Sequence, residues 1–276
     1  MAGRRVTAAL PLPALCALII PVCAGIGWMA LVEAPASYRI VNAAALALAC
    51  LWIVFARAPS GISGWRVIGA AAVAVLAVPL VAGPSVSGVN RWIEIGGLAL
   101  HSGFLALPAL VVASARDRRW GATMLAAALL PLVIQPDAGT GLALTFAAAG
   151  IHDRTREWRF GMIAILGFFL TLSMAFRGEL PPQPFVERVL QQALSDHFML
   201  ALMLTAGLIV AFTAIIRGIG ADPAERYGLA GALFGFFVMA LVSHYPYPLI
   251  GYGASSILGF GLAIGLAESG RPRPAG

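Results

Sequence analysis

Apolar segments long enough to cross a lipid bilayer recur along the whole of this chain. A hydrocarbon core about 30 Å thick requires about 20 mostly apolar residues in a helix. Of the 276 residues, 60% are hydrophobic and only 11% are charged, whereas soluble domains contain about 45–50% apolar residues. The pattern predicts an all-α, polytopic membrane protein with ten spans in a single transmembrane domain, residues 1–276. The predicted spans are 8–32, 39–57, 66–83, 95–115, 121–135, 138–151, 159–176, 196–216, 226–243 and 252–268.

The arginines predict which side of the membrane each loop faces, because cytoplasmic loops carry an excess of basic residues. If both termini are cytoplasmic, fourteen of the eighteen basic residues lie inside and four lie outside. The arginines that give the net charge of +6 therefore set the orientation of the protein in the membrane, and nucleic-acid binding is not expected. In this topology, residues 177–196 form an external loop and residues 270–276 a cytoplasmic tail. The external arginines are Arg39, Arg91, Arg177 and Arg188.

Residues 121–151 are expected to form a helical hairpin. A single helix over these residues would be about 46 Å long, and the arginine-rich stretches on either side can both be cytoplasmic only if two spans separate them. The turn is predicted at "QPDAG", residues 135–139. Because each arm is shorter than the hydrocarbon core, the turn should lie below the outer surface, buried in protein or beside a wet cavity. Asp137 in this turn caps the following helix or marks a substrate path, and these two interpretations are compatible.

Two external segments place charged residues near the outer surface. In "GVNRWIEIGG", residues 88–97, Arg91 either pairs with Glu94 at the membrane interface or is presented to a phosphate, which suits a planar guanidinium. In residues 181–198, prolines precede a helical pattern that leads into the eighth predicted span. Asp196 stands at the outer end of that span, where it is either a cap or first-turn acid, or a functional acid.

A third external segment, "YPYPLIGYGASS" at residues 245–256, combines prolines and glycines before the last predicted span. This combination is common where a loop enters a helix. Ser255 and Ser256 are expected to hydrogen-bond the backbone or neighbouring helices.

The sequence shows no pattern typical of a metal site or of nucleophilic catalysis. The three cysteines lie inside apolar spans without CxxC or CxxH spacing, so they are expected to be small packing residues. His197 has no second His or Cys spaced to complete a metal site. Neither a GxSxG nor a Walker pattern occurs.

Four of these stretches, in order and on the same side, resemble the shape, elongation, division and sporulation (SEDS) family, polytopic proteins that include RodA, FtsW and SpoVE. "GVNRWIEIG" is similar to the family's GxxRWI segment, and "QPDAGTGLAL" to its QPDLGTAL. "SDHFMLALMLTAG" is similar to its TDFIFA segment, and "YPYPLIGYGASS" to its PLPFISYGGSS. The resemblance spans nearly the whole chain.

The resemblance implies a peptidoglycan glycosyltransferase of the bacterial inner membrane with a transpeptidase partner. Such a protein polymerises lipid II, the undecaprenyl-pyrophosphate-linked disaccharide peptide. Carried over by position, Asp196 falls on the family's essential external aspartate and would accept the proton of the attacking glycan hydroxyl. Arginines or a divalent cation would stabilise the departing pyrophosphate. The positions implied to bind substrate are Arg91, Asp137, Tyr252, Ser255 and Ser256.

The sequence also departs from the family. The family's QPSExxK is here "HSGFLAL", so Phe104 and Leu107 replace its glutamate and lysine, and two expected glutamates are Leu204 and Thr205. The external loop before the aspartate is short. Three hypotheses therefore stay open: a lipid II polymerase, a catalytically degenerate relative that binds a lipid-linked precursor or a cell-wall enzyme, and a transporter of a lipid-linked substrate. The last is disfavoured because no inverted repeat is found.

Overall fold

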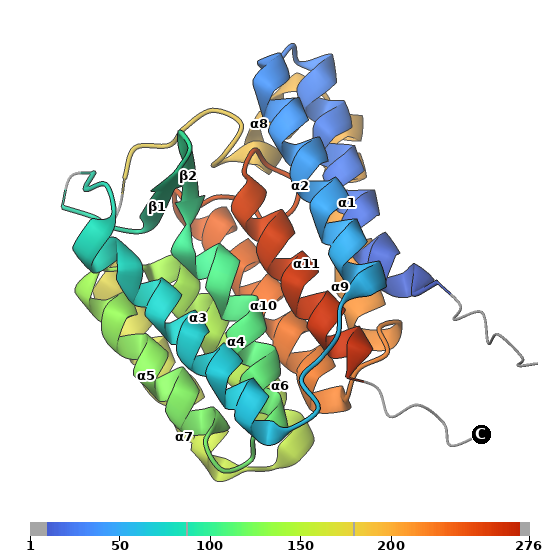
Figure 1. The fold of residues 1–276 in the computed structure, drawn as a ribbon. Helices are drawn as coiled ribbons and strands as arrows, with labels where there is room; N and C mark the ends of the chain where they lie inside the picture. The colour runs from blue at the N-terminus through green and yellow to red at the C-terminus, as the bar shows by residue number, and fades with distance from the viewer. Residues whose placement is uncertain (1–9, 87, 179, 271–276) are drawn as a thin grey trace, which may run out of the picture.

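The computed structural model describes residues 10–86, 88–178 and 180–270. Within them the chain forms eleven α-helices and one β-hairpin (Figure 1). The elements are α1 (Leu12–Leu31), α2 (Ala36–Phe55), α3 (Ile62–Ala82), β1 (Trp92–Ile95), β2 (Leu98–His101), α4 (Ser102–Arg116), α5 (Gly121–Ile134), α6 (Ala138–Thr155), α7 (Trp158–Ala175), α8 (Val189–Asp196), α9 (Phe198–Arg217), α10 (Pro223–Val242) and α11 (Ala254–Ser269).

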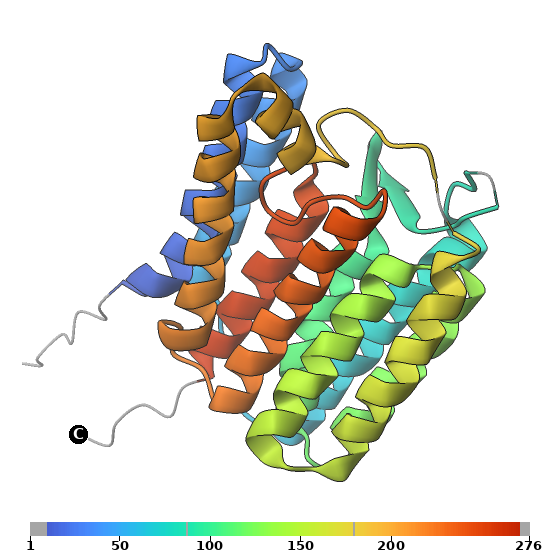
Figure 2. The ribbon, with the colours of Figure 1, turned by 180° about the vertical axis from the view of Figure 1, so that it is seen from behind.

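Ten of these helices, α1 to α7 and α9 to α11, correspond in order to the ten predicted spans. They run alternately up and down, so the two described ends of the chain lie at the same end of the bundle (Figures 1 and 2). Among the described residues, six helices are long and apolar enough to cross a membrane, and α4, α5 and α11 are shorter apolar helices. The prediction of an all-α polytopic membrane protein is confirmed.

The fourth predicted span, 95–115, begins too early. Residues 92–101 form the hairpin of β1 and β2, and α4 begins only at Ser102. Gly96 and Gly97 form the turn with φ of +58° and +79°, a backbone that glycine adopts without strain and that suits a two-residue hairpin. Two glycines between short apolar stretches are thus a hairpin signal that hydropathy alone overlooks.

The outer end of the eighth predicted span is broken as well. α8 ends at Asp196 and α9 begins at Phe198. Between them His197 has an extended backbone, with φ of −162° and ψ of 126°. The helical pattern expected before the span is present, but it forms a separate short helix.

The predicted hairpin of residues 121–151 is confirmed, because α5 ends at Ile134 and α6 begins at Ala138. The turn between them is buried, as expected for irregular backbone below the membrane surface. α6 packs closely along α10, and a Cβ atom at Gly231 of α10 would collide with the carbonyl of Phe146. Small residues allow this close approach of two membrane helices. The contact positions α6, and with it the buried turn.

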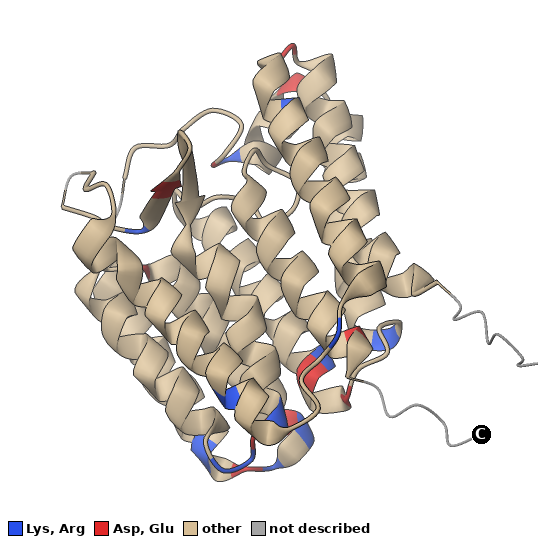
Figure 3. Cartoon of the chain, viewed as in Figure 1, with Lys and Arg blue, Asp and Glu red and all other residues tan. Residues whose placement is uncertain are grey.

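Charged residues gather at the end of the bundle opposite the β-hairpin (Figure 3). Arg66 pairs there with Asp117 at 2.7 Å, and Arg116 pairs with Glu225. The positive-inside rule assigns this end to the cytoplasm, so the β-hairpin lies at the external end. Of the predicted cytoplasmic tail, 270–276, all but Gly270 lies outside the described residues.

Candidate substrate-binding cavity

A cavity of about 240 Å³ lies beneath the β-hairpin at the external end of the bundle. β2 and the start of α4 line one side of it, and the 245–253 loop with the start of α11 lines another. The structure brings together here three of the residues predicted to bind substrate. They are Tyr252, Ser255 and Ser256.

Hydrogen bonds and ring stacking hold these three residues in place. The Ser255 hydroxyl oxygen accepts a hydrogen bond from the His101 backbone N–H at 2.8 Å. The Ser256 hydroxyl oxygen accepts one from a backbone N–H of the 245–253 loop at 3.2 Å. The Tyr252 ring stacks on Tyr38 of α2, with 3.8 Å between ring centroids. The expected bonding of both serines to the backbone is confirmed, and one wall of the cavity is preorganised.

Asn42 of α2 also holds this wall, although none of the sequence motifs includes it. Its buried side-chain amide donates to the Gly251 carbonyl at 2.9 Å and accepts from the Gly253 N–H at 3.1 Å. An amide inside an otherwise apolar span is itself a signal, because polar groups within a membrane require partners.

Asp137 is fully buried and caps α6, as one interpretation of the sequence predicted. Its Oδ1 atom accepts a hydrogen bond from the Thr140 N–H at 3.1 Å, and its Oδ2 atom accepts one from the Thr140 hydroxyl at 2.6 Å. His101 Nε2 lies 3.8 Å from Asp137 Oδ2, which is too far for a hydrogen bond. His101 lines the cavity and Asp137 does not. The acid therefore lies next to a lining residue, His101, without lining the cavity itself.

Arg91 is bonded to the protein backbone through one of its guanidinium nitrogens, Nη2. Its side chain is 3% exposed and donates hydrogen bonds to the carbonyls of Pro136, at 2.6 Å, and of Gly178. Its guanidinium carbon lies 4.7 Å from the centroid of the Tyr245 ring. Among the described residues no ion pair joins Arg91 to Glu94, so the predicted pairing is wrong. Arg91 instead ties the α5–α6 turn to the segment that follows α7, and its binding of a phosphate stays a prediction.

Asp196 is exposed at the C-terminal end of α8 and is not among the residues that line the cavity. Its interpretation as a cap or first-turn acid of the following span is wrong, because α9 begins two residues later and His197 occupies its N-cap position. The break at His197 separates Asp196 from that helix. Its role as a catalytic base stays a prediction.

The acidic groups that the sequence places around an external cavity do not line it. The lining residues that the structure describes include no Asp or Glu. Asp137 turns toward the first turn of α6, and Asp196 ends a separate helix. Nor do the described residues contain any group of three or more His, Cys, Asp or Glu that could hold a metal ion.

No protein-family model matches this sequence, and no curated protein matches it. Solved structures, in contrast, match nearly its whole length. The rod shape determining protein RodA of Thermus thermophilus matches with a TM-score of 0.68 and 20% sequence identity, over 96% of this chain and 96% of RodA. This chain has a SEDS-like fold.

Two further structures agree with this assignment of the SEDS-like fold. An aspartate-to-alanine mutant of the same RodA matches over 95% of this chain and 97% of its own, with a TM-score of 0.68 and 20% identity. A chain from a structure on the coordination of polymerization and crosslinking by a peptidoglycan synthase complex matches over 93% and 96%, with a TM-score of 0.62 and 20% identity. At this identity the likeness shows the fold alone.

Within the SEDS-like fold, the two positions where a glutamate and a lysine were expected belong to the apolar core. Phe104 is 2% exposed and stacks on Phe236 of α10, with 4.0 Å between ring centroids. Leu107 is fully buried in the same core. Neither side chain can supply charge, and their surroundings are packed to suit apolar groups.

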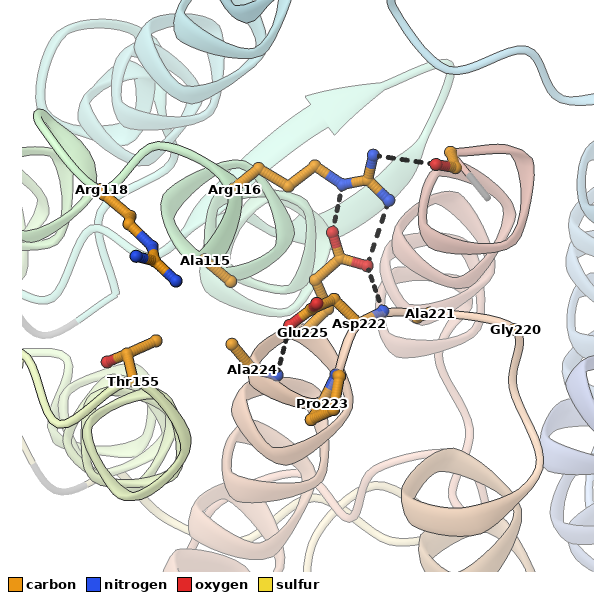
Figure 4. Close-up of a pocket in the computed structure, with 11 residues that line it drawn as sticks. Ala115, Arg116, Arg118, Thr155, Gly220, Ala221, Asp222, Pro223, Ala224 and Glu225 are labelled. Carbon is orange, nitrogen blue, oxygen red and sulfur yellow. Dashed lines mark hydrogen bonds and ion pairs between the residues drawn. The ribbon is translucent and has the colours of Figure 1, made fainter. Parts of the chain in front are cut away.

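A second cavity, of about 540 Å³, lies at the cytoplasmic end (Figure 4). Its wall contains the Arg116–Glu225 ion pair, and Glu225 Oε2 also accepts a hydrogen bond from the Asp222 N–H at 3.2 Å. The Arg116 guanidinium lies 4.3 Å from the Trp65 ring centroid and donates to the Gly270 carbonyl at 3.4 Å. These contacts join α3, α4, α10 and the end of α11, so we interpret this cluster as a structural junction.

Proposed function

We propose that this protein acts in peptidoglycan synthesis in the bacterial inner membrane, where it binds lipid II at its external end and polymerises it. The observation that carries the proposal is the convergence of three family-like segments at one end of a RodA-like fold. The hairpin of residues 92–101 and the 245–256 segment line one cavity. The α5–α6 turn lies against it through His101 and is held by Arg91.

In the proposed reaction, a hydroxyl group of the acceptor glycan attacks the anomeric carbon of lipid II. The bond between that carbon and the pyrophosphate oxygen breaks, and undecaprenyl pyrophosphate leaves. Asp196 accepts the hydroxyl proton as the general base. Its exposure at the end of α8 leaves it accessible to a substrate larger than the cavity. Because the described residues offer no three-ligand metal site, a divalent cation would be held largely by the pyrophosphate itself.

The proposal includes a transpeptidase partner. Support comes from the similar structure described as a peptidoglycan synthase complex that coordinates polymerization and crosslinking. The partner would crosslink the strands that this chain produces.

The test is polymerisation of lipid II by the purified full chain in liposomes. We expect the wild type to form glycan strands, and we expect Asp196→Ala and Asp196→Asn to lower the rate roughly 100-fold or more, the usual effect of losing a general base. Glu33→Gln is the matched control, because Glu33 is an exposed acid in the α1–α2 turn at the same end. Strands formed at the wild-type rate by Asp196→Ala would reject the assignment of the base.

A second candidate function is binding of the lipid-linked precursor, or of a cell-wall enzyme, without turnover. It is favoured by Phe104 and Leu107, which fill the positions of a glutamate and a lysine with buried apolar side chains. This function predicts that lipid II binds to the wild type but that no strands form, even with prolonged incubation. Robust polymerisation in the same liposomes would exclude it.

A further inference from the structure

We propose that the external cavity is a subsite for one uncharged sugar ring of the lipid-linked substrate, and that the pyrophosphate binds outside it. This inference rests on the proposed function and specifies which part of lipid II the cavity holds. It follows from the charge, the walls, the free hydrogen-bonding groups and the size of the cavity.

The described lining of the cavity carries no charged side chain. The described residues that line the cavity include no Asp, Glu or Arg, and the chain contains no lysine. The nearby cation, Arg91, is buried and already donates to two backbone carbonyls. A pyrophosphate in a site without cations would keep its negative charges uncompensated. The cavity therefore suits a neutral group better than an anion.

Aromatic rings form part of the cavity wall. Trp92 of β1 and Tyr252 of the 245–253 loop line the cavity with partly exposed rings, whereas the lining residue Phe104 is 2% exposed and offers little of its ring. The Tyr252 ring is held in place by stacking on Tyr38. The electron-rich face of an aromatic ring attracts the weakly positive C–H groups that cover one face of a sugar ring. A rigid aromatic surface of this kind costs little entropy when a ring packs on it.

Neutral polar groups also line the cavity. The oxygens of Ser255 and Ser256 accept backbone hydrogen bonds, so each hydroxyl hydrogen remains to be donated. Sugar hydroxyl groups both donate and accept, and they can satisfy such groups without bringing a charge into the cavity.

The cavity is also small. The cavity volume of about 240 Å³ is below the ~300–1,000 Å³ of sites that enclose a drug-sized ligand. A whole lipid-linked disaccharide peptide cannot fit, whereas a single ring can. The rest of the substrate, including the pyrophosphate and the lipid, must then lie outside.

The test compares two lipids, lipid II and undecaprenyl pyrophosphate without sugar, for binding to the full chain in nanodiscs. We expect wild type to bind lipid II at least tenfold more tightly than the sugar-free lipid. Ala99→Trp should abolish this difference, because Ala99 lines the cavity from an exposed position of β2 and a large ring there would fill the space. Ile95→Trp is the matched control. Ile95 is exposed on the same hairpin but does not line the cavity, so its variant should keep the difference.

A competition measurement does not depend on a variant. The soluble disaccharide of N-acetylglucosamine should displace lipid II from wild type, and inorganic pyrophosphate at the same concentration should not. Equal binding of the two lipids by wild type, or displacement by pyrophosphate alone, would overturn the sugar subsite and leave precursor binding in place. If neither lipid binds, both this inference and the proposed function fail. A tenfold preference for lipid II that survives Ala99→Trp would also overturn the inference.

Discussion

Two cavities of this protein, the external one and the cytoplasmic one, lie at opposite ends of one bundle and differ in how they accommodate polar groups. The cytoplasmic cavity has the buried Glu225 in its wall and neutralises it with Arg116 (Figure 4). The external cavity has no charged residue among the described residues that line it, and its polar side chains bond mainly to backbone groups. The cytoplasmic cavity is thus held together by compensated charge, and the described lining of the external cavity has no charged side chain. This difference leaves the external cavity suited to an uncharged ligand.

The largest expected effect is at the cytoplasmic end. Arg116→Met leaves Glu225, which is 1% exposed, as a buried charge without its partner. We expect a loss of about 3–5 kcal/mol in the free energy of unfolding, the usual cost of breaking a buried pair. Unfolding in mixed micelles by titration with sodium dodecyl sulfate measures it. The double variant Arg116→Met with Glu225→Leu should recover most of the loss, because no unpaired charge remains. If Arg116→Met alone lowers the free energy of unfolding by less than about 1 kcal/mol, the buried ion pair does not hold the cytoplasmic end together, and the comparison between the two ends is wrong.

A smaller effect is expected at the external end, where Asp137 acts as a helix cap. Asp137→Ala should cost about 1–2 kcal/mol, and Asp137→Asn only a few tenths, because asparagine is an equally good cap. The same detergent titration distinguishes the two variants. If Asp137→Asn is as damaging as Asp137→Ala, the carboxylate is required beyond its role as a helix cap, and the contrast between the two ends is smaller.

The smallest effect concerns Glu187, in the loop before α8. Burial raises the pKa of this carboxyl above its ordinary value of 4.5. A raised pKa means that the folded state favours the protonated carboxyl of Glu187. This protonated carboxyl therefore stabilises the fold fully below about pH 4.5, and the stabilisation is lost as the pH rises through the folded-state pKa. Glu187→Gln should therefore stabilise the protein at pH 7.5, by less than about 1 kcal/mol. At pH 4 the gain should vanish, as unfolding titrations at the two pH values can show. A gain of equal size at both pH values would refute this explanation.

Glutamine is a close match at this position because its side-chain oxygen can still accept the hydrogen bond that Glu187 takes from the Gln183 N–H at 2.7 Å. The charge is then the main property that changes. If Glu187→Gln destabilises the protein at pH 7.5, the ionised carboxylate of Glu187 is favourable in the folded state. The two ends would then differ less in how they accommodate charge.

Local features of the fold could be predicted from the sequence. The ten spans follow from apolar length, and the hairpin of residues 121–151 follows from the arginines on both of its sides. The cap at Asp137 follows from its place directly before a helix, because its partner is Thr140, three residues away. Each of these features depends on neighbouring residues only. The β-hairpin was equally local, and Gly96–Gly97 could have predicted it.

The candidate site could be predicted only in part. The family-like motifs identified Tyr252, Ser255 and Ser256, which do meet at one cavity. They did not identify Asn42 or His101, whose hydrogen-bond partners lie 209 and 154 residues away in the chain. Residues so far apart in the chain share no local sequence pattern, so their contact could not be inferred from the sequence.

By itself, the sequence determined the membrane class, the number and order of the spans, the orientation and the position of the buried turn, because hydropathy, charge and capping act over a few residues. The tertiary structure decided which polar groups reach the external cavity. It turned Arg91 onto the carbonyl of Pro136, 45 residues away, and left Asp196 on a separate helix outside the cavity. The physical reason is that a buried polar group must find a partner wherever packing places one, and packing joins segments that are distant in the chain.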